Sequence, residues 1–431
     1  MSHKSQSTTQ ITKANSYKHR VAVVCDSFPK LSESFITQHI TGLMDKGCEV
    51  EIFAMKKSPD TLNHSVVEKY QLLNRAHYAI RMPTGRAQKY LQGLKLLLRA
   101  MMRTPIIALK SINIFKYGSL ALNLRLLYLI TAFHGQKYDV IHVHFGPIGN
   151  LVEKMIEIGA IKGKLVVTFH GYDLNQKNII TQEGYYDSLF RAAHRLLVNS
   201  LFSYSKLLAL GAPKNKVEIV PMPVDTDFFK RDNKSSKDNA TYNLLSVSRL
   251  SEEKGLIYAI KAVEQYSKES DINIRYDIVG NGPLIDDLKN YVNKHNLNNH
   301  IHFLGEQTQE AVKELMNKSD VLLFPSIELP TGEADTQGLV IQEAQSMGLP
   351  VIASDVGGVK FGMKDGISGH LVEQKSVSQL VQALGNLLKD TAIRKKMGDA
   401  GRLNVIKNYS VDVVMERMCD LYSDVKRKLP I

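Results

Sequence analysis

The stretch YNLLSVSRLSEEKGLIYAIKAVEQYSK, residues 242–268, combines a short run with an apolar centre, a polar loop and an amphipathic segment. The run at residues 242–248 is typical of a strand buried on both faces, as in a parallel sheet. The apolar spacing beyond the loop predicts a helix over residues 255–268. A strand that leads directly into a helix is the repeating unit of a doubly wound α/β domain.

The same unit recurs downstream of this stretch. Further strands are expected at residues 274–279, 301–304, 321–324 and 351–354, and helices at residues 283–296, 309–318, 339–347 and 377–388. A last helix is expected over residues 411–428. The second half of the chain is therefore expected to form a parallel sheet covered by helices.

The first half of the chain has the same alternation. Strands are expected at residues 21–25, 50–55, 140–145, 165–169, 196–199 and 217–221, with a helix at 35–46. The 431 residues exceed the roughly 250–300 residues that one core serves, so we expect two domains. The expected division is a flexible tail at 1–18, an N-terminal domain at 19–225, a C-terminal domain at 226–410 and a final helix at 411–431 that packs back toward the N-terminal domain.

Positive charge is concentrated in one segment of the first half. The net charge is +12, and from Lys69 to Lys137 the chain holds twelve lysines and arginines but no Asp or Glu. An acidic partner surface is implied, either anionic lipid or nucleic acid. We expect no nucleic-acid partner, because the segment lacks interleaved aromatic platforms and any known reading motif.

An apolar stripe lies among these basic residues, within segment 81–133. Its members are Tyr90, Leu91, Leu94, Leu96–Leu98, Met101 and Met102. This pattern suits a helix that lies on an anionic membrane surface. The alternative is that the apolar face packs inside the N-terminal domain and only the charges face outward.

Cysteine usage and hydropathy indicate the compartment. The three cysteines are odd in number and form no C-x-x-C pair, so neither a disulfide framework nor a zinc site is expected. The N-terminus lacks the apolar segment of a secretory signal, and no uncharged apolar run reaches the roughly 18–20 residues of a membrane span. We expect a cytoplasmic protein, peripheral on the inner face of the cell membrane.

The loop at residues 248–255 is a candidate anion site. Arg249 and Lys254 lie five residues apart, between a strand and the start of a helix. Two cations beside free helix N–H groups suit a diphosphate. The alternative is a solvated loop with incidental charges.

The segment Val279-Gly280-Asn281-Gly282 follows the next expected strand. Its glycines permit close approach of a ligand to the backbone. The third glycine of a dinucleotide-binding fingerprint is missing, so a dinucleotide is weakly indicated. A tight strand-to-helix turn is an equally good interpretation of this segment alone.

The stretch EADTQGLVIQEA, residues 333–344, is the densest in candidate ligand groups. Gly338 is expected where a loop meets a helix, so the N–H groups of Leu339 and Val340 could face an anion. Glu343 is then on the second helical turn, where it could accept hydrogen bonds from a ribose diol. The alternative for Asp335 and Glu343 is an acidic group favoured by the helix dipole and a surface glutamate.

Polar residues also follow strands in the N-terminal half. His170 and Asp173 come after the strand at 165–169, at the edge where open α/β sheets bind ligands. His142 and His144 alternate on a buried strand, lack other ligands at suitable spacing, and are expected to be packing residues without a metal. Ser32 and Glu33 lie in the loop after the first strand, where they could meet phosphate or acceptor; the alternative is a helix N-cap by Ser32 with the acidic Glu33 behind it.

The motifs occur in one order that resembles glycosyltransferase family 4, the retaining GT-B enzymes. The resemblance covers roughly residues 19–421 and is carried by SVSRLSEEKG, YDIVGNGPL, IHFLGEQTQEAV, DVLLFPS and GLVIQEAQSMGLPVIASDVGG, with VHFGP, TFHGYD, LLVNS and IVPMPVDTDFF before them. The opening FPKLSESFITQHITGL is similar to the exopolysaccharide subgroup, such as colanic-acid-type transferases. The resemblance implies two Rossmann-like domains facing across a cleft, with a nucleotide-sugar site in the C-terminal one.

The resemblance also implies residue roles. Arg249 and Lys254 would bind the donor diphosphate together with Gly338, Leu339 and Val340, and Glu343 would bind the ribose. Gly280, Asn281 and Gln307 would lie near the base, and His170 would contact the donor sugar from across the cleft. The sites implied as catalytic are His170, Asp335 and Glu343, and those on the acceptor side are Ser32, Glu33 and Asp173. The chain departs from the family at Asp335, where the family has the first glutamate of its paired-Glu motif. The aspartate keeps the charge, but its side chain is one methylene shorter, so its contact with the sugar hydroxyls is expected to be shifted or lost.

The function implied is retaining, metal-independent hexosyl transfer, without a cofactor, from a nucleotide-sugar to a glycan or lipid-linked acceptor in bacterial surface or exopolysaccharide synthesis. Alternatives are a sugar-nucleotide epimerase, a phosphorylase, which would need a cofactor lysine site that the sequence does not offer, and a catalytically inactive nucleotide-sugar sensor.

Overall fold

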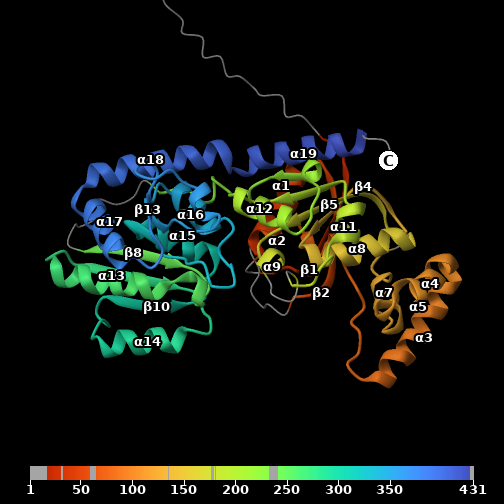
Figure 1. The fold of residues 1–431 in the computed structure, drawn as a ribbon. Helices are drawn as coiled ribbons and strands as arrows, with labels where there is room; N and C mark the ends of the chain where they lie inside the picture. Colours follow the sequence, from red (N-terminus) through yellow and green to blue (C-terminus); the bar gives the residue numbers. More distant parts are fainter. Residues whose placement is uncertain are drawn as a thin grey trace, which may run out of the picture.

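The computed structural model describes residues 17–30, 33–58, 65–133, 135–175, 179, 181–232 and 241–427. Most of the expected tail and residues 233–240 lie outside these ranges. The described chain forms two parallel sheets, each covered by helices (Figure 1). The predicted doubly wound α/β class is confirmed.

The first sheet has the strand order β3-β2-β1-β4-β5-β6-β7. Its strands are β1 (Arg20–Phe28), β2 (Glu49–Lys57), β3 (Ala76–Tyr78), β4 (Lys137–His144), β5 (Lys162–Phe169), β6 (Arg195–Val198) and β7 (Val217–Ile219). The flanking helices include α1 (Ser34–Asp45), α2 (Ser65–Lys69), α8 (Gly146–Ile158), α9 (Tyr172–Asn175), α11 (Asp187–Ala192) and α12 (Leu201–Ala209). Residues 21–25 of the central strand β1 are fully buried, as expected of a strand covered on both faces.

The second sheet has the order β10-β9-β8-β11-β12-β13. Its strands are β8 (Tyr242–Val247), β9 (Ile274–Val279), β10 (Ile301–Gly305), β11 (Val321–Phe324), β12 (Val351–Ser354) and β13 (His370–Val372). Its helices are α13 (Leu256–Glu269), α14 (Ile285–Lys294), α15 (Gln309–Lys318), α16 (Leu339–Ser346), α17 (Val377–Lys389) and α18 (Thr391–Asn408). The sequence pattern did not indicate the short edge strands β3 and β13 or helix α18. Three-residue strands carry little periodicity, and α18 buries only Met397, Gly398, Gly401 and Val405, so its apolar face is weak.

The last helix, α19 (Val411–Arg427), connects the two sheets. It continues from α18, which packs on α16 of the second sheet, and then lies against α1 and β4 of the first (Figure 1). Its buried face, which includes Val414, Met418 and Tyr422, belongs to the core around β1. The C-terminal segment is therefore built into the core of the N-terminal half.

A group of helices projects from the first sheet on the side away from the second (Figure 1). It comprises α3 (Arg86–Arg103), α4 (Pro105–Ser111), α5 (Ile114–Tyr117), α6 (Ser119–Leu122) and α7 (Arg125–Leu129). We call this group the helical arm. Among the described helices of the chain, none combines the length and apolar character needed to cross a bilayer.

Candidate functional site in the cleft

Two cavities that share residues lie at the carboxyl ends of the central strands. The smaller, of about 450 Å³, is lined from the first domain by Phe35, His170, Asn199 and Met222 and from the second by the loops after β8 and β11 and the start of α16. The larger, of about 870 Å³, is lined mainly by the loops after β8, β9 and β10. Val247, Ser248 and Arg249 line both cavities. Ligands of open α/β sheets bind at this edge.

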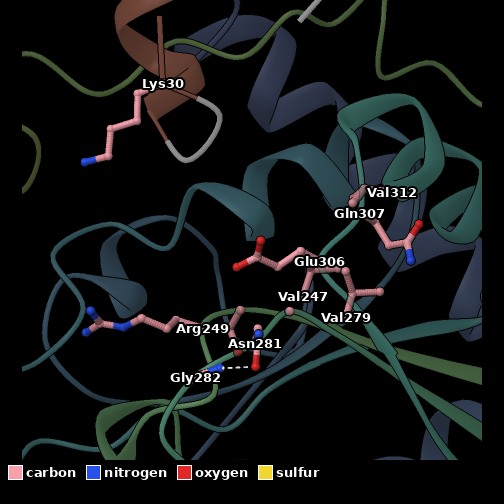
Figure 2. A pocket seen from close by; sticks show the side chains of 11 residues that line it. Lys30, Val247, Arg249, Val279, Asn281, Gly282, Glu306, Gln307 and Val312 are labelled. Atoms are coloured by element: carbon pink, nitrogen blue, oxygen red, sulfur yellow. Dashed lines mark hydrogen bonds between the residues drawn. The ribbon is translucent and has the colours of Figure 1, made fainter. Parts of the chain in front are cut away.

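Arg249 lies where the two cavities meet. Its Nη2 is 3.0 Å from Oε1 of Glu253, and its Nε donates to Oγ of Ser251 at 3.2 Å. The side chain is nevertheless 65% exposed, and Figure 2 shows it extending from the loop after β8. Burial raises the pKa of Glu253, but hydrogen bonds from Ser251 and Arg249 outweigh it and hold that pKa below its usual value. A carboxylate thus holds Arg249 while its guanidinium stays open to a ligand.

Lys254 pairs with Asp335 in the wall of the smaller cavity. Nζ of Lys254 is 2.5 Å from Oδ1 of Asp335, and the two side chains are only 18% and 13% exposed. The other carboxylate oxygen, Oδ2, is buried without a hydrogen-bond partner among the described residues. A buried carboxylate oxygen of this kind is costly unless a ligand supplies a donor.

Helix α16 points its first turn into the same cavity. Gly338 caps it with φ +73°, a left-handed conformation that glycine adopts without strain. Leu339 and Val340 begin the helix, so their N–H groups have no partner within it, and both residues line the cavity with Arg249 and Lys254. The structure therefore brings together the two cations and the helix start that the sequence placed about 85 residues apart.

Glu343 lies on the second turn of α16, as the sequence predicted, but outside the lining of both cavities. Burial raises the pKa of Glu343 to about 7, and a hydrogen bond from Gln309 opposes the rise only in part. Its carboxyl group therefore changes charge near neutral pH, which is unusual for a glutamate.

The larger cavity contains the residues predicted near a base. Gly280 has φ +126°, and a Cβ on it would lie 1.9 Å from the carbonyl oxygen of Ser248, so only glycine fits. Asn281 and Gln307 also line the cavity, together with Lys30 and Glu306, which the sequence did not indicate (Figure 2). Lys30 comes from the first domain and lies apart from the second-domain side chains that Figure 2 labels.

His170 joins the two domains at the site. Its backbone carbonyl accepts a hydrogen bond from Oγ1 of Thr336 at 2.7 Å, and that hydroxyl accepts one from Nδ2 of Asn199 at 2.9 Å. The sequence did not single out Thr336 or Asn199. The position of Thr336 beside Asp335, and of Asn199 at the end of a predicted strand, was the available signal.

The acceptor-side prediction is corrected for Asp173. This carboxylate is fully buried, and it accepts hydrogen bonds from the amides of His170 and Gly171 at 2.9 Å and of Gly146 at 2.8 Å. Burial raises its pKa, and these hydrogen bonds oppose the rise. Asp173 therefore fixes the backbone that carries His170 and is closed to an acceptor.

The other two acceptor-side residues are placed differently. Ser32 lies outside the described residues, so its predicted role as a helix cap does too. Glu33 is itself the N-cap residue of α1, and its Oε1 is 2.5 Å from Nζ of Lys30. Burial raises the pKa of Glu33, and it is outside the lining of both cavities.

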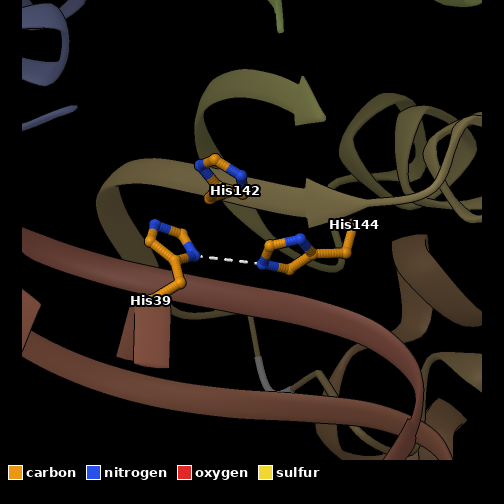
Figure 3. A group of neighbouring side chains, drawn as sticks. All are labelled: His39, His142 and His144. Atoms are coloured by element: carbon orange, nitrogen blue, oxygen red, sulfur yellow. Dashed lines mark hydrogen bonds between the residues drawn. The ribbon is translucent and has the colours of Figure 1, made fainter. Parts of the chain in front are cut away.

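Three histidines gather beneath His170. His142 and His144 on β4 are buried, as predicted, but His39 of α1 joins them, and nitrogen atoms of the three lie within 4.8 Å of one another (Figure 3). Sequence spacing did not indicate His39 as a neighbour of His142 and His144, because α1 brings it in from about 100 positions away. Both nitrogens of each ring already have hydrogen-bond partners, which does not favour a metal site.

Comparison with known proteins gives one consistent result. Residues 32–228 match the family described as Glycosyltransferase Family 4, and residues 227–404 match Glycosyl transferases group 1. WcaL of Escherichia coli, which carries the name of a colanic acid biosynthesis glycosyltransferase, is 31% identical over 366 residues. The alignment covers 83% of this chain and 87% of the length of WcaL. The amylovoran biosynthesis glycosyltransferase AmsK of Erwinia amylovora is 28% identical, and the alignment covers 91% of this chain and 97% of the length of AmsK.

Solved structures agree in fold. Anabaena HepE in complex with UDP and glucose superposes with a TM-score of 0.69 at 16% identity, covering 94% of this chain and all of its own. Sucrose-phosphate synthase from Thermosynechococcus elongatus gives a TM-score of 0.65 at 19% identity over 94% of this chain and 99% of its own. The predicted GT-B arrangement is confirmed, and the chain belongs to the family 4 glycosyltransferases.

Proposed function

We propose that the chain transfers a hexosyl group from a nucleoside-diphosphate sugar to a glycan or lipid-linked acceptor, with retention of anomeric configuration. The observation that carries the proposal is the smaller cavity, where Arg249, Lys254 and the start of α16 converge. A diphosphate is the ligand class that such a set neutralises best. The names of WcaL and AmsK support a role in bacterial exopolysaccharide synthesis, and the bound UDP and glucose of HepE support the donor class.

In the proposed reaction, the bond between the anomeric carbon and the leaving diphosphate oxygen breaks as the acceptor hydroxyl bonds to the same face of that carbon. The hydroxyl proton passes to the leaving phosphate oxygen, so no protein base is needed. Arg249, Lys254 and the amides of Leu339 and Val340 stabilise the negative charge that develops on the leaving group. The two cations supply the charge that a metal ion supplies in other transferases, so we propose that no metal is required.

The remaining site residues hold the rest of the donor. Gly280, Asn281 and Gln307 lie at the proposed base position in the larger cavity, and Glu343 is proposed to accept hydrogen bonds from the ribose hydroxyls. Because Glu343 lies outside the lining of both cavities, this contact requires α16 and the ribose to approach on binding. His170 and Asp335 are proposed to contact the sugar from opposite domains.

Donor affinity should depend on pH through Glu343. Its pKa is raised to about 7, so it is mostly a carboxylate, able to accept from both ribose hydroxyls, only above that pH. We expect the Kd of the donor sugar nucleotide to rise about tenfold from pH 8 to pH 6, in proportion to the lost carboxylate. Calorimetric titration at both pH values measures this change, and Glu343→Gln should bind more weakly but with a Kd that is nearly constant. An equal pH slope in the variant would contradict the assignment.

The helical arm is proposed to dock on an anionic membrane on the cytoplasmic side. Most of the predicted apolar stripe is exposed, with Leu91 at 61% and Met102 at 79%, whereas Leu96 is only 7% exposed. The alternative, that the stripe packs inside the domain, therefore holds only for Leu96 and, in part, Leu97. Exposed apolar side chains among basic ones fit the headgroup region of an anionic bilayer.

Liposome flotation tests this docking. The chain should float with vesicles that contain anionic lipid at low salt, and Leu91→Glu/Met102→Glu should lower the partition coefficient about tenfold or more, because two apolar contacts are lost. Leu403→Glu, at an equally exposed position on α18, is the matched control and should bind like the unaltered chain. Absence of binding at low salt would end the proposal.

A thermal-shift screen against UDP-, GDP- and ADP-sugars, followed by transfer assays on lipid-linked acceptors, tests the function itself. We expect one sugar nucleotide to stabilise the protein and to be consumed with transfer of its sugar, in the presence of a metal chelator as well. Epimerised donor without transfer would identify an epimerase. Stabilisation with no turnover on any acceptor would identify an inactive sensor.

A further inference from the structure

A chain of hydrogen bonds runs from the cleft into the core of the first domain. It links side chains from α1, β4, β5, α19 and the loop after β5. The distances are 2.9, 3.0, 3.1, 2.6 and 2.8 Å in the order His170, His144, His39, Tyr422, His142 and Thr168. Figure 3 shows its three buried histidines, with the bond between His39 and His144 dashed. Of these six residues, only His170 lines the cleft cavity, so the other five lie behind the site.

The three buried histidines of this hydrogen-bond chain, His39, His142 and His144, are neutral. Burial lowers the pKa of His39 to about 3 and those of His142 and His144 well below the usual value. A neutral imidazole has one N–H donor and one acceptor nitrogen, and both nitrogens of each ring are engaged. Reversing one ring therefore requires its neighbours to reverse as well, so His170, His144 and His39 share one order of protons.

The distances at Tyr422 give the direction of that order. Its hydroxyl is 2.6 Å from Nδ1 of His142 and 3.1 Å from Nε2 of His39. O–H donors make shorter hydrogen bonds than N–H donors, so Tyr422 donates to His142 and accepts from His39. His39 then accepts at Nδ1 from Nε2–H of His144, and His144 accepts at Nδ1 from Nε2–H of His170.

This order leaves a lone pair on Nδ1 of His170. Among the described residues, no hydrogen-bond partner of that nitrogen occurs, and the ring is held between Phe35 at 4.6 Å and Phe145 at 4.7 Å, measured between centroids. We propose that His39, His144 and Tyr422 are positioning residues that hold His170 in its Nε2–H tautomer, so that Nδ1 offers a hydrogen-bond acceptor to a donor-sugar hydroxyl. The role of that acceptor rests on the proposed function, whereas the tautomer does not.

The proposal also gives helix α19 a part in the site. Tyr422 lies 252 residues beyond His170 in sequence, and it is fully buried. Without its hydroxyl, Nε2–H of His39 would be a buried donor with no acceptor, which is more costly than an unused lone pair. The cheaper arrangement reverses His39, His144 and His170 together and places the proton of His170 on Nδ1.

Two-bond ¹H–¹⁵N spectra of histidine-labelled protein at pH 7 test this order without any donor. We expect His170, identified by the signal lost in His170→Gln, to be the Nε2–H tautomer, and to change to Nδ1–H in Tyr422→Phe. Tyr276→Phe removes an equally buried hydroxyl, bonded to Ser246 in the second domain, and should leave His170 unchanged. An Nδ1–H tautomer or a mixture of tautomers in the unaltered protein would overturn the proposal. This result does not depend on whether Tyr422→Phe folds.

Turnover tests the role of the tautomer separately. In a transfer assay, Tyr422→Phe should lower kcat about tenfold, roughly the effect of one misdirected hydrogen bond, with a melting temperature no lower than that of Tyr276→Phe. Unchanged kcat in a variant whose tautomer has reversed would overturn the positioning role. If no transfer occurs with the unaltered protein, the proposed function fails while the spectra still decide the proton order.

Discussion

Replacing Arg249 with alanine is expected to lower kcat/KM about 10²–10³-fold, the range found when one preorganised charge-stabilising donor is removed. The guanidinium lies where the two cavities meet, so it can reach the leaving diphosphate. Fold stability should change by about 0–1 kcal/mol, because the pair with Glu253 is largely exposed on the arginine side. Steady-state kinetics and thermal melting measure the two effects.

The matched control is Arg275→Ala. Arg275 lies on β9 of the same domain, pairs with Asp277 at 2.9 Å and is 45% exposed, but it is outside both cavities. It should keep nearly full activity. Near-normal turnover in folded Arg249→Ala, or an equal loss in both variants, would count against the proposed diphosphate site.

Lys254→Met should lower both activity and stability. It removes the second cation from the cavity, for which we expect a fall in kcat of about 100-fold. It also leaves Asp335 buried with neither oxygen paired, which should cost about 2–4 kcal/mol of unfolding free energy. Chemical denaturation and turnover under saturating donor measure these changes.

A second substitution separates the two effects of Lys254→Met. Adding Asp335→Asn replaces the unpaired carboxylate with a neutral amide, so most of the stability should return while activity stays low. Recovery of activity together with stability would mean that Lys254 acts only through folding. A single variant as stable as the unaltered protein would mean that the pair is not buried in solution.

The sequence predicts the alternating core well, because each buried strand and the helix after it are local patterns. The two cations at 249 and 254 and the helix start at 338 were also predictable, since the carboxyl ends of β8 and β11 meet at one sheet edge. Which cavity each residue lines was not predictable. Glu343 has the predicted helical position, yet it stands outside both cavities.

The errors come from contacts between segments far apart in the chain. Asp173 has the sequence of an exposed loop residue, but three amides, including that of Gly146, enclose it. His142 and His144 gave no hint of His39 or Tyr422, which arrive on α1 and α19. The exposure of the stripe on α3 also depended on tertiary packing, because an amphipathic pattern does not tell a core face from a membrane face.

The central claim is that Arg249, Lys254 and the start of α16 bind one pyrophosphate. Calorimetric titration tests it directly. UDP, GDP and ADP, and for comparison the corresponding nucleosides, are titrated into the unaltered protein and into Arg249→Ala/Lys254→Met. At least one diphosphate should bind the unaltered protein and lose about 100-fold or more in affinity in the double variant, while its nucleoside binds both alike. Equal affinity of that diphosphate for the unaltered protein and a folded double variant would contradict the account.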